Sequence, residues 1–187
     1  MKGLLAISSI VFTIGVLSIP VVWSDDDFNW KETGKYRDKS SGVAAITNPL
    51  YKEECGSCHM SYPPGLLPER SWVRMMSGLE DHFGDNAELD SETARSIEQF
   101  LLKNSADKSE YKRSRKFNQS IKSDVTPLRI SELSYFKHEH DEIPKRMVTG
   151  NAEVKSFSQC NACHTKAEQG KFNEHDINIP GFGKWDD

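Results

Sequence analysis

The sequence predicts an all-α protein, and three observations support this prediction. Asn48-Pro49 has the form of a helix start, with a capping side chain followed by proline in the first turn. Asp90 is placed to cap another helix, in which Ile97 and Leu101 lie on one apolar side. No stretch shows a convincing alternation of apolar and polar residues, so no strand is expected.

The expected helices divide the chain into two lobes. They cover residues 48–59, 68–83, 90–103, 131–143 and 156–167. We expect a first lobe at 48–104, a linker or surface insertion at 105–127 and a second lobe at 128–187. Residues 105–124 are polar, locally basic and without period, which favours a solvated loop. The tail from residue 171 onward is expected to be extended and irregular.

The N-terminus has the pattern of an export signal. Lys2 precedes an almost wholly apolar stretch from Leu4 to Val22. We expect a signal peptide at 1–24, a polar arm at 25–47 and a location in the periplasm. An uncleaved anchor facing the periplasm is the alternative, because the apolar stretch is long enough to span a bilayer. The net charge is −4 without a basic stripe, so nucleic acid is not an expected partner.

Two copies of one motif contain all four cysteines of the chain. They are Cys55-Gly-Ser-Cys58-His59 and Cys160-Asn-Ala-Cys163-His164. A C-x-x-C-H run is the attachment signature of a c-type haem. The two thiols form thioethers with the haem vinyl groups, and the adjacent imidazole binds the iron. The sequence therefore predicts two covalently bound haem c groups, with His59 and His164 as proximal iron ligands.

Other uses of paired cysteines explain the sequence less well. A zinc ribbon also contains two C-x-x-C pairs, but usually with about 15–20 residues between them. The two pairs here lie much farther apart in the chain. A redox dithiol or a structural disulfide leaves unexplained why a histidine directly follows the second cysteine in both motifs.

The residue that fills the sixth coordination position decides whether each iron is open or closed. His82 and His140 are the strongest candidates for this distal position. On the expected helix that begins at residue 68, His82 lies on the same side as Met75. On the expected helix at 131–143, His140 shares an apolar face with Leu133 and Phe136.

The other candidate ligands have weaker patterns. His138 falls on the solvent side of its expected helix, and His175 lies in a polar run. The rival ligands are the methionines Met75, Met76 and Met147. Methionine in an apolar setting more often serves as packing, but Met147 lies in a loop and stays a candidate.

Local folding favours pairing His59 with His82 and His164 with His140. A crossed arrangement, in which each distal histidine reaches the other haem, stays open. We also expect a carbonyl near Pro63 or Pro64 to hold the His59 ring.

Several further stretches resemble the bacterial dihaem cytochrome c family. They are Tyr62-Pro-Pro-Gly-Leu-Leu-Pro68, Trp72, His82-Phe-Gly-Asp-Asn-Ala87, Arg129-Ile-Ser131, Glu139-His-Asp-Glu-Ile-Pro144 and Cys163-His-Thr-Lys-Ala-Glu-Gln-Gly170. The likeness extends over about Pro49 to Pro180. The resemblance implies a first lobe similar to a class I cytochrome c and an unusual small helical second haem lobe. It also implies bis-histidine ligation of both irons, with His82 and His140 at the matching positions.

The function that the resemblance implies is electron transfer. We expect a periplasmic, low-potential dihaem carrier that is not an enzyme. The implied partners are redox proteins, among them a small oxygen-binding monohaem cytochrome and a membrane cytochrome b. The alternatives are a dihaem peroxidase-like enzyme and a haem-based gas or redox sensor, both of which need an iron site that can open.

Overall fold

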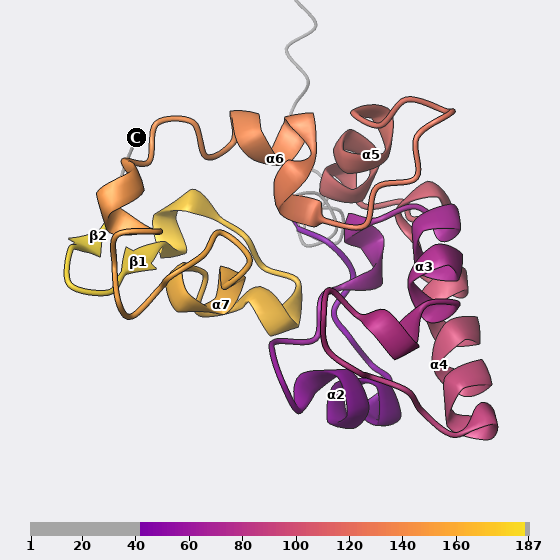
Figure 1. Cartoon of the computed structure of the whole chain (residues 1–187). Coiled ribbons are helices and arrows are strands. Elements are labelled where there is room, and N and C mark those ends of the chain that lie inside the picture. Colours follow the sequence, from indigo (N-terminus) through magenta and orange to yellow (C-terminus); the bar gives the residue numbers. More distant parts are fainter. Residues whose placement is uncertain (1–41, 186–187) are drawn as a thin grey trace, which may run out of the picture. The chain divides into compact units, whose positions relative to one another are not determined.

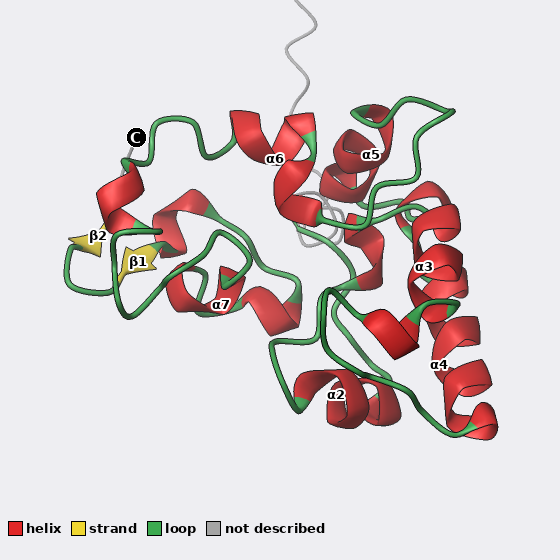
Figure 2. Ribbon diagram, viewed as in Figure 1, coloured by secondary structure: helices red, strands yellow, loops and turns green. Residues whose placement is uncertain are grey.

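The computed structural model describes residues 42–185, and helices dominate this part of the chain (Figures 1 and 2). The helices are α2 (Pro49–Gly56), α3 (Glu69–Met76), α4 (Ser91–Lys103), α5 (Lys112–Gln119), α6 (Ser134–His138) and α7 (Cys160–Cys163). Single 3₁₀ turns connect several of them. The predicted all-α class is confirmed, with one minor antiparallel pair of strands added, β1 (Asn178–Ile179) and β2 (Gly183–Lys184). The predicted signal peptide and most of the predicted polar arm lie outside the described residues.

Helix α2 begins as the sequence predicts but ends earlier. The Asn48 side chain accepts a hydrogen bond of 3.0 Å from the amide of Tyr51, and Pro49 occupies the first turn. The helix ends at Gly56, so Cys58 and His59 lie in the turn that follows it. The two cysteines of the motif are therefore presented by a helix end and not by a continuous helix.

Helices α3 and α4 lie side by side and contribute much of the core (Figure 1). Trp72 from α3 and Ile97 and Leu101 from α4 are almost fully buried. The predicted cap of α4 is confirmed, because one carboxylate oxygen of Asp90 accepts hydrogen bonds from the amides of Glu92 and Thr93. The apolar spacing of α4 was thus sufficient to predict both its extent and its buried side.

The prediction that one helix runs from residue 68 to residue 83 is wrong. Helix α3 ends at Met76, and a 3₁₀ turn at Leu79–Asp81 leads into a tight turn that carries His82. In that turn Phe83 and Gly84 have φ of 58° and 103°. A bulky residue in this region is strained by about 1–3 kcal/mol. His82 is therefore placed by a turn, and its helical alignment with Met75 does not exist.

The segment expected to be a solvated loop contains packed structure. A 3₁₀ turn at Ala106–Lys108 is followed by α5, whose Phe117 is only 5% exposed and whose Ser114 is fully buried. Phe117 is the one large apolar residue in the helix, so the sequence shows no periodic stripe.

The second half of the chain has shorter helices than predicted. The helix expected at 131–143 consists of a 3₁₀ turn at Ile130–Glu132 and the short α6, so His140 lies beyond the helix end. The helix expected at 156–167 is reduced to α7. The tail is not wholly irregular, since Asn178 pairs with Lys184 in the strand pair. Within residues 42–185, no helix is long and apolar enough to cross a membrane.

Gly170 allows the start of the described chain to pack against the second motif's segment. It has φ of 73° and ends the 3₁₀ turn Ala167–Gln169. Its carbonyl accepts a 3.0 Å hydrogen bond from the amide of Val43, and a Cβ at this position would collide with the Val43 carbonyl. A side chain is therefore excluded here both by conformation and by space.

Replacing Gly170 by alanine should destabilise the protein more than the same change at Gly181. Both glycines have positive φ, which costs alanine about 1–2 kcal/mol, but open space surrounds Gly181. Urea unfolding followed by circular dichroism measures both free energies of unfolding. Equal losses in Gly170→Ala and Gly181→Ala would contradict the close approach of Gly170 to Val43.

Candidate functional site

The first motif places its histidine in a fixed orientation. The Nδ1–H of His59 donates a 2.8 Å hydrogen bond to the carbonyl oxygen of Met60, which leaves Nε2 available to a metal. The expectation that a proline carbonyl holds this ring is wrong. The Pro64 carbonyl accepts a 2.8 Å hydrogen bond from the indole of Trp72 instead.

His82 lies opposite His59 at a distance that suits a shared metal. The two ring centroids are 6.1 Å apart, and the ring planes differ by 22°. A bond from an imidazole nitrogen to a first-row metal is about 2.0 Å long, and the centre of the ring lies about 1.1 Å behind that nitrogen. Two rings that bind one metal from opposite sides therefore have their centres about 6.2 Å apart. The observed separation leaves room for one metal ion between the rings.

The second motif is built on a single helical turn. The amide of His164 donates a 2.8 Å hydrogen bond to the carbonyl of Cys160, which brings the histidine back toward the first cysteine. A bridge between His164 and Ile177 ties the motif to the segment before β1. The ring of Phe172 packs edge-on against the His164 ring at 5.4 Å.

His140 lies opposite His164 at the same distance as in the first pair. The ring centroids are again 6.1 Å apart, but the ring planes differ by 77°. The His140 ring stacks on Phe136 at 3.9 Å and 12°, and its Nδ1–H donates a 2.8 Å hydrogen bond to the Phe136 carbonyl. Phe157 packs edge-on against the same ring at 5.9 Å.

The structure therefore brings together His59 with His82 and His140 with His164, the pairs that local folding favours. His138 is exposed, with 79% of its side chain accessible, and the His175 side chain is 73% exposed. The methionines have the surroundings of packing residues. Met75 and Met76 contact the hydrophobic core, and Met147 is buried.

Burial favours the neutral form of two imidazoles, His82 and His164, and the protonated form of two thiols, Cys55 and Cys160. It lowers the pKa of His164 to about 4, with nearby His140 adding to the effect, and it also lowers the pKa of His82. A neutral imidazole is the form that binds a metal. Burial raises the pKa of Cys55 and Cys160 to about 11, whereas redox-active thiols have lowered pKa values. All four cysteines are unpaired, which contradicts the disulfide alternative.

A known protein family matches this chain over much of its length. The family model described as Dihaem cytochrome c matches residues 51–172, which is more than half of the chain. The chain belongs to the dihaem cytochrome c family. A search of curated proteins found no match.

Solved structures of dihaem cytochromes c are similar over most of the chain. The X-ray structure of the protein from Shewanella baltica OS155 is 45% identical, covers 74% of this chain and 98% of its own, and has a TM-score of 0.62. The dihaem cytochrome c from Rhodobacter sphaeroides is 44% identical, with coverage of 70% and 100% and a TM-score of 0.63. A second structure from Rhodobacter sphaeroides is 45% identical, with coverage of 68% and 99% and a TM-score of 0.55.

The residues present fit the two haem c groups that the family carries. Each motif supplies two thiols and one imidazole within five consecutive residues. Each imidazole also faces a second one at the separation that a shared iron requires. The predicted pair of covalently bound haem c groups is confirmed at the level of the family.

Sequence reasoning missed Tyr62, which connects the two motifs. Its ring lies 5.1 Å from the His59 ring, and its hydroxyl donates a 2.8 Å hydrogen bond to the carbonyl of Ser158, two residues before Cys160. Its own carbonyl accepts a 2.7 Å hydrogen bond from the Tyr51 hydroxyl. The signals available in the sequence were its position soon after the first motif and its place at the start of the stretch Tyr62–Pro68.

Arg113 was missed because it lies in the segment expected to be a loop. Its guanidinium donates to Glu139 at 3.2 Å and to the Phe172 carbonyl at 3.1 Å. Its charge also contributes to the lowered pKa of His164. α5 is thereby tied to the surroundings of the second motif, a link that nothing in the local sequence indicates.

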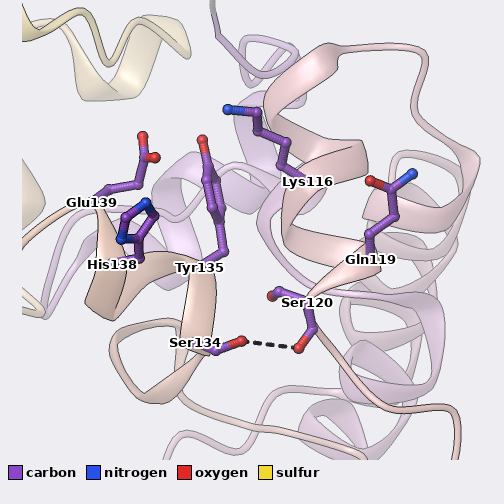
Figure 3. A pocket seen from close by; sticks show the side chains of 7 residues that line it. All are labelled: Lys116, Gln119, Ser120, Ser134, Tyr135, His138 and Glu139. Carbon is purple, nitrogen blue, oxygen red and sulfur yellow. Dashed lines mark hydrogen bonds between the residues drawn. The ribbon is translucent and has the colours of Figure 1, made fainter.

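A surface pocket is lined by residues of α5 and α6 and of the segments next to them (Figure 3). Its lining residues are Lys116, Gln119, Ser120, Ser134, Tyr135, His138 and Glu139. The Ser134 hydroxyl donates a 3.1 Å hydrogen bond to the Ser120 carbonyl across it. None of the motif cysteines or paired histidines lines this pocket, so it is not part of the haem sites.

Replacing Cys160 and Cys163 together by alanine should remove one of the two covalent haems. The remaining motif is intact, so the protein should retain one haem attached at Cys55 and Cys58. Intact-mass spectrometry and a haem assay on the purified protein measure the count. The reciprocal double variant at Cys55 and Cys58 is the matched control, and a haem count of two in either variant would contradict the assignment.

Proposed function

We propose that this protein is a periplasmic electron carrier with two low-potential, bis-histidine haems. The observation that carries the proposal is the equal separation of 6.1 Å between the rings of each histidine pair. Bound haem iron supplies one-electron chemistry between its ferric and ferrous forms. The role of the chain is to hold that iron, set its potential and limit access to it.

His59 and His164 act as proximal ligands, and His82 and His140 act as distal ligands. An imidazole on each side would leave bound haem iron no open position for a substrate. Closure of both positions favours a carrier over a peroxidase-like enzyme or a gas or redox sensor, because those functions require an iron site that can open.

The surroundings of the ligands favour low reduction potentials. Histidine gives a lower potential than methionine in the same position. The hydrogen bonds from Nδ1 of His59 to Met60 and from Nδ1 of His140 to Phe136 make those imidazoles more basic and so stabilise the ferric state.

Tyr62 offers a short connection between the two sites. Its ring contacts the His59 ring, and its hydroxyl reaches the chain two residues before Cys160. We infer that this tyrosine holds the two haem-binding segments at a fixed separation, which electron exchange between them requires.

The proposed partners are redox proteins outside the cytoplasm. A small oxygen-binding monohaem cytochrome and a membrane cytochrome b are the candidates that family resemblance suggests. The chain carries a net charge of −4, to which ionised haem propionates would add, so basic surfaces on a partner would be attracted. Export would rest on the apolar segment within residues 1–24.

Single replacement of each distal histidine tests the ligation. In His82→Ala and in His140→Ala, one of the two haems should become high-spin while the other stays low-spin, because each variant opens one iron. Optical and EPR spectra of the oxidised proteins measure this change. His138→Ala is the matched control, since that side chain is exposed and only two residues from His140. Low-spin spectra for both haems in both ligand variants would overturn the proposed ligand set.

A further inference from the structure

The two distal histidines are held very differently. The His140 ring stacks on Phe136 and meets the edge of Phe157, and its Nδ1–H is bonded to a backbone carbonyl. Three separate contacts therefore fix its orientation. Movement of this ring away from His164 would break all of them.

His82 has far less support. Within residues 42–185, its Nδ1 is buried and has no hydrogen-bond partner. A metal-bound imidazole normally donates this proton to an acceptor, which orients the ring and strengthens it as a ligand. Apart from the facing His59, the ring contact recorded for His82 is the edge of its neighbour Phe83. His82 is therefore the weaker and less constrained of the two distal ligands.

The backbone that carries His82 is also strained. A two-residue turn joins His82 to Asp85, with the His82 amide donating at 2.7 Å to the Asp85 carbonyl. Phe83 occupies the left-handed region with φ of 58°, where a bulky side chain is disfavoured. Its ring is 45% exposed, so burial in the core does not hold it in place. Release of His82 would relieve strain at the cost of few contacts.

Arg129 holds this turn from a distant part of the sequence. Its guanidinium carbon lies 4.0 Å from the centroid of the Phe83 ring, within the range of a cation–π contact. Arg129 also forms an exposed ion pair of 3.7 Å with Glu132, at the end of the 3₁₀ turn that follows it. Arg129 thus restrains the turn that carries His82.

We propose that His82 can be released from the reduced iron, so that a small uncharged ligand such as carbon monoxide binds in its place. The Arg129–Phe83 stack holds the turn that carries His82 and so slows this release. The site at His140 is fixed and does not exchange. The proposal rests on the proposed bis-histidine ligation and adds that only one of the two irons can open. Carbon monoxide binding is an exchange of one neutral ligand for another, so no electron or proton needs a further acceptor.

The test uses carbon monoxide and the reduced full-length protein with both haems attached. We expect slow uptake of one equivalent per protein, seen in the visible spectrum. In Arg129→Ala the uptake should be about five-fold faster, which corresponds to the loss of about 1 kcal/mol of cation–π contact. Arg115→Ala, which removes an exposed arginine from α5, is the matched control and should match the parent protein.

His82→Ala assigns the site. In that variant, one equivalent should bind rapidly and the slow phase should disappear. A slow phase that persists in His82→Ala places the exchange at the other haem and overturns the proposal. The absence of carbon monoxide uptake by the parent protein overturns it as well. If the parent protein is low-spin in both oxidised haems yet takes up no ligand, this inference fails and the proposed carrier function stands. High-spin iron in the oxidised parent protein would mean that the carrier proposal itself fails.

Discussion

The rest of the structure depends on one constraint, which is that the two imidazole rings of each pair stand far enough apart to hold one metal ion between them. Both histidine pairs meet it at 6.1 Å, although the elements that carry them differ. Short helices and 3₁₀ turns lie between the two histidines of each pair, because the chain must bring one imidazole back over the other. Only 36% of the residues are hydrophobic, so two buried porphyrins would supply apolar surface that the side chains alone do not.

The two sites share this spacing but differ in how rigidly it is maintained. His140 lies just beyond α6 and is held by Phe136 and Phe157, whereas His82 projects from a strained turn. Arg113 anchors the second site through α5, and Tyr62 connects the two motifs. Under the proposed bis-histidine ligation, both irons would stay closed during electron transfer, and the two sites would differ in their resistance to ligand exchange.

The sequence was sufficient for features that depend on local pattern, and insufficient for those that depend on distant contacts. The two C-x-x-C-H motifs and helix α4 with its Asp90 cap follow from spacing and capping chemistry alone. His82 does face His59, but the helix from which it was predicted ends at Met76. His82 lies instead in a turn in which Phe83 has positive φ, a conformation that a bulky residue rarely adopts. Helix α5 has a single large buried side chain, Phe117, and is stabilised by tertiary packing that a periodic pattern does not reveal.

The most direct test of the central claim is an EPR spectrum of the oxidised, unmodified protein. The angle between two axial imidazoles sets the splitting of the iron d orbitals that interact with the rings. We expect two low-spin signals of equal intensity and no high-spin iron. One signal should be rhombic, from the near-parallel pair at 22°, and the other strongly axial, from the crossed pair at 77°. A high-spin signal from either haem, or two identical low-spin signals, would contradict it.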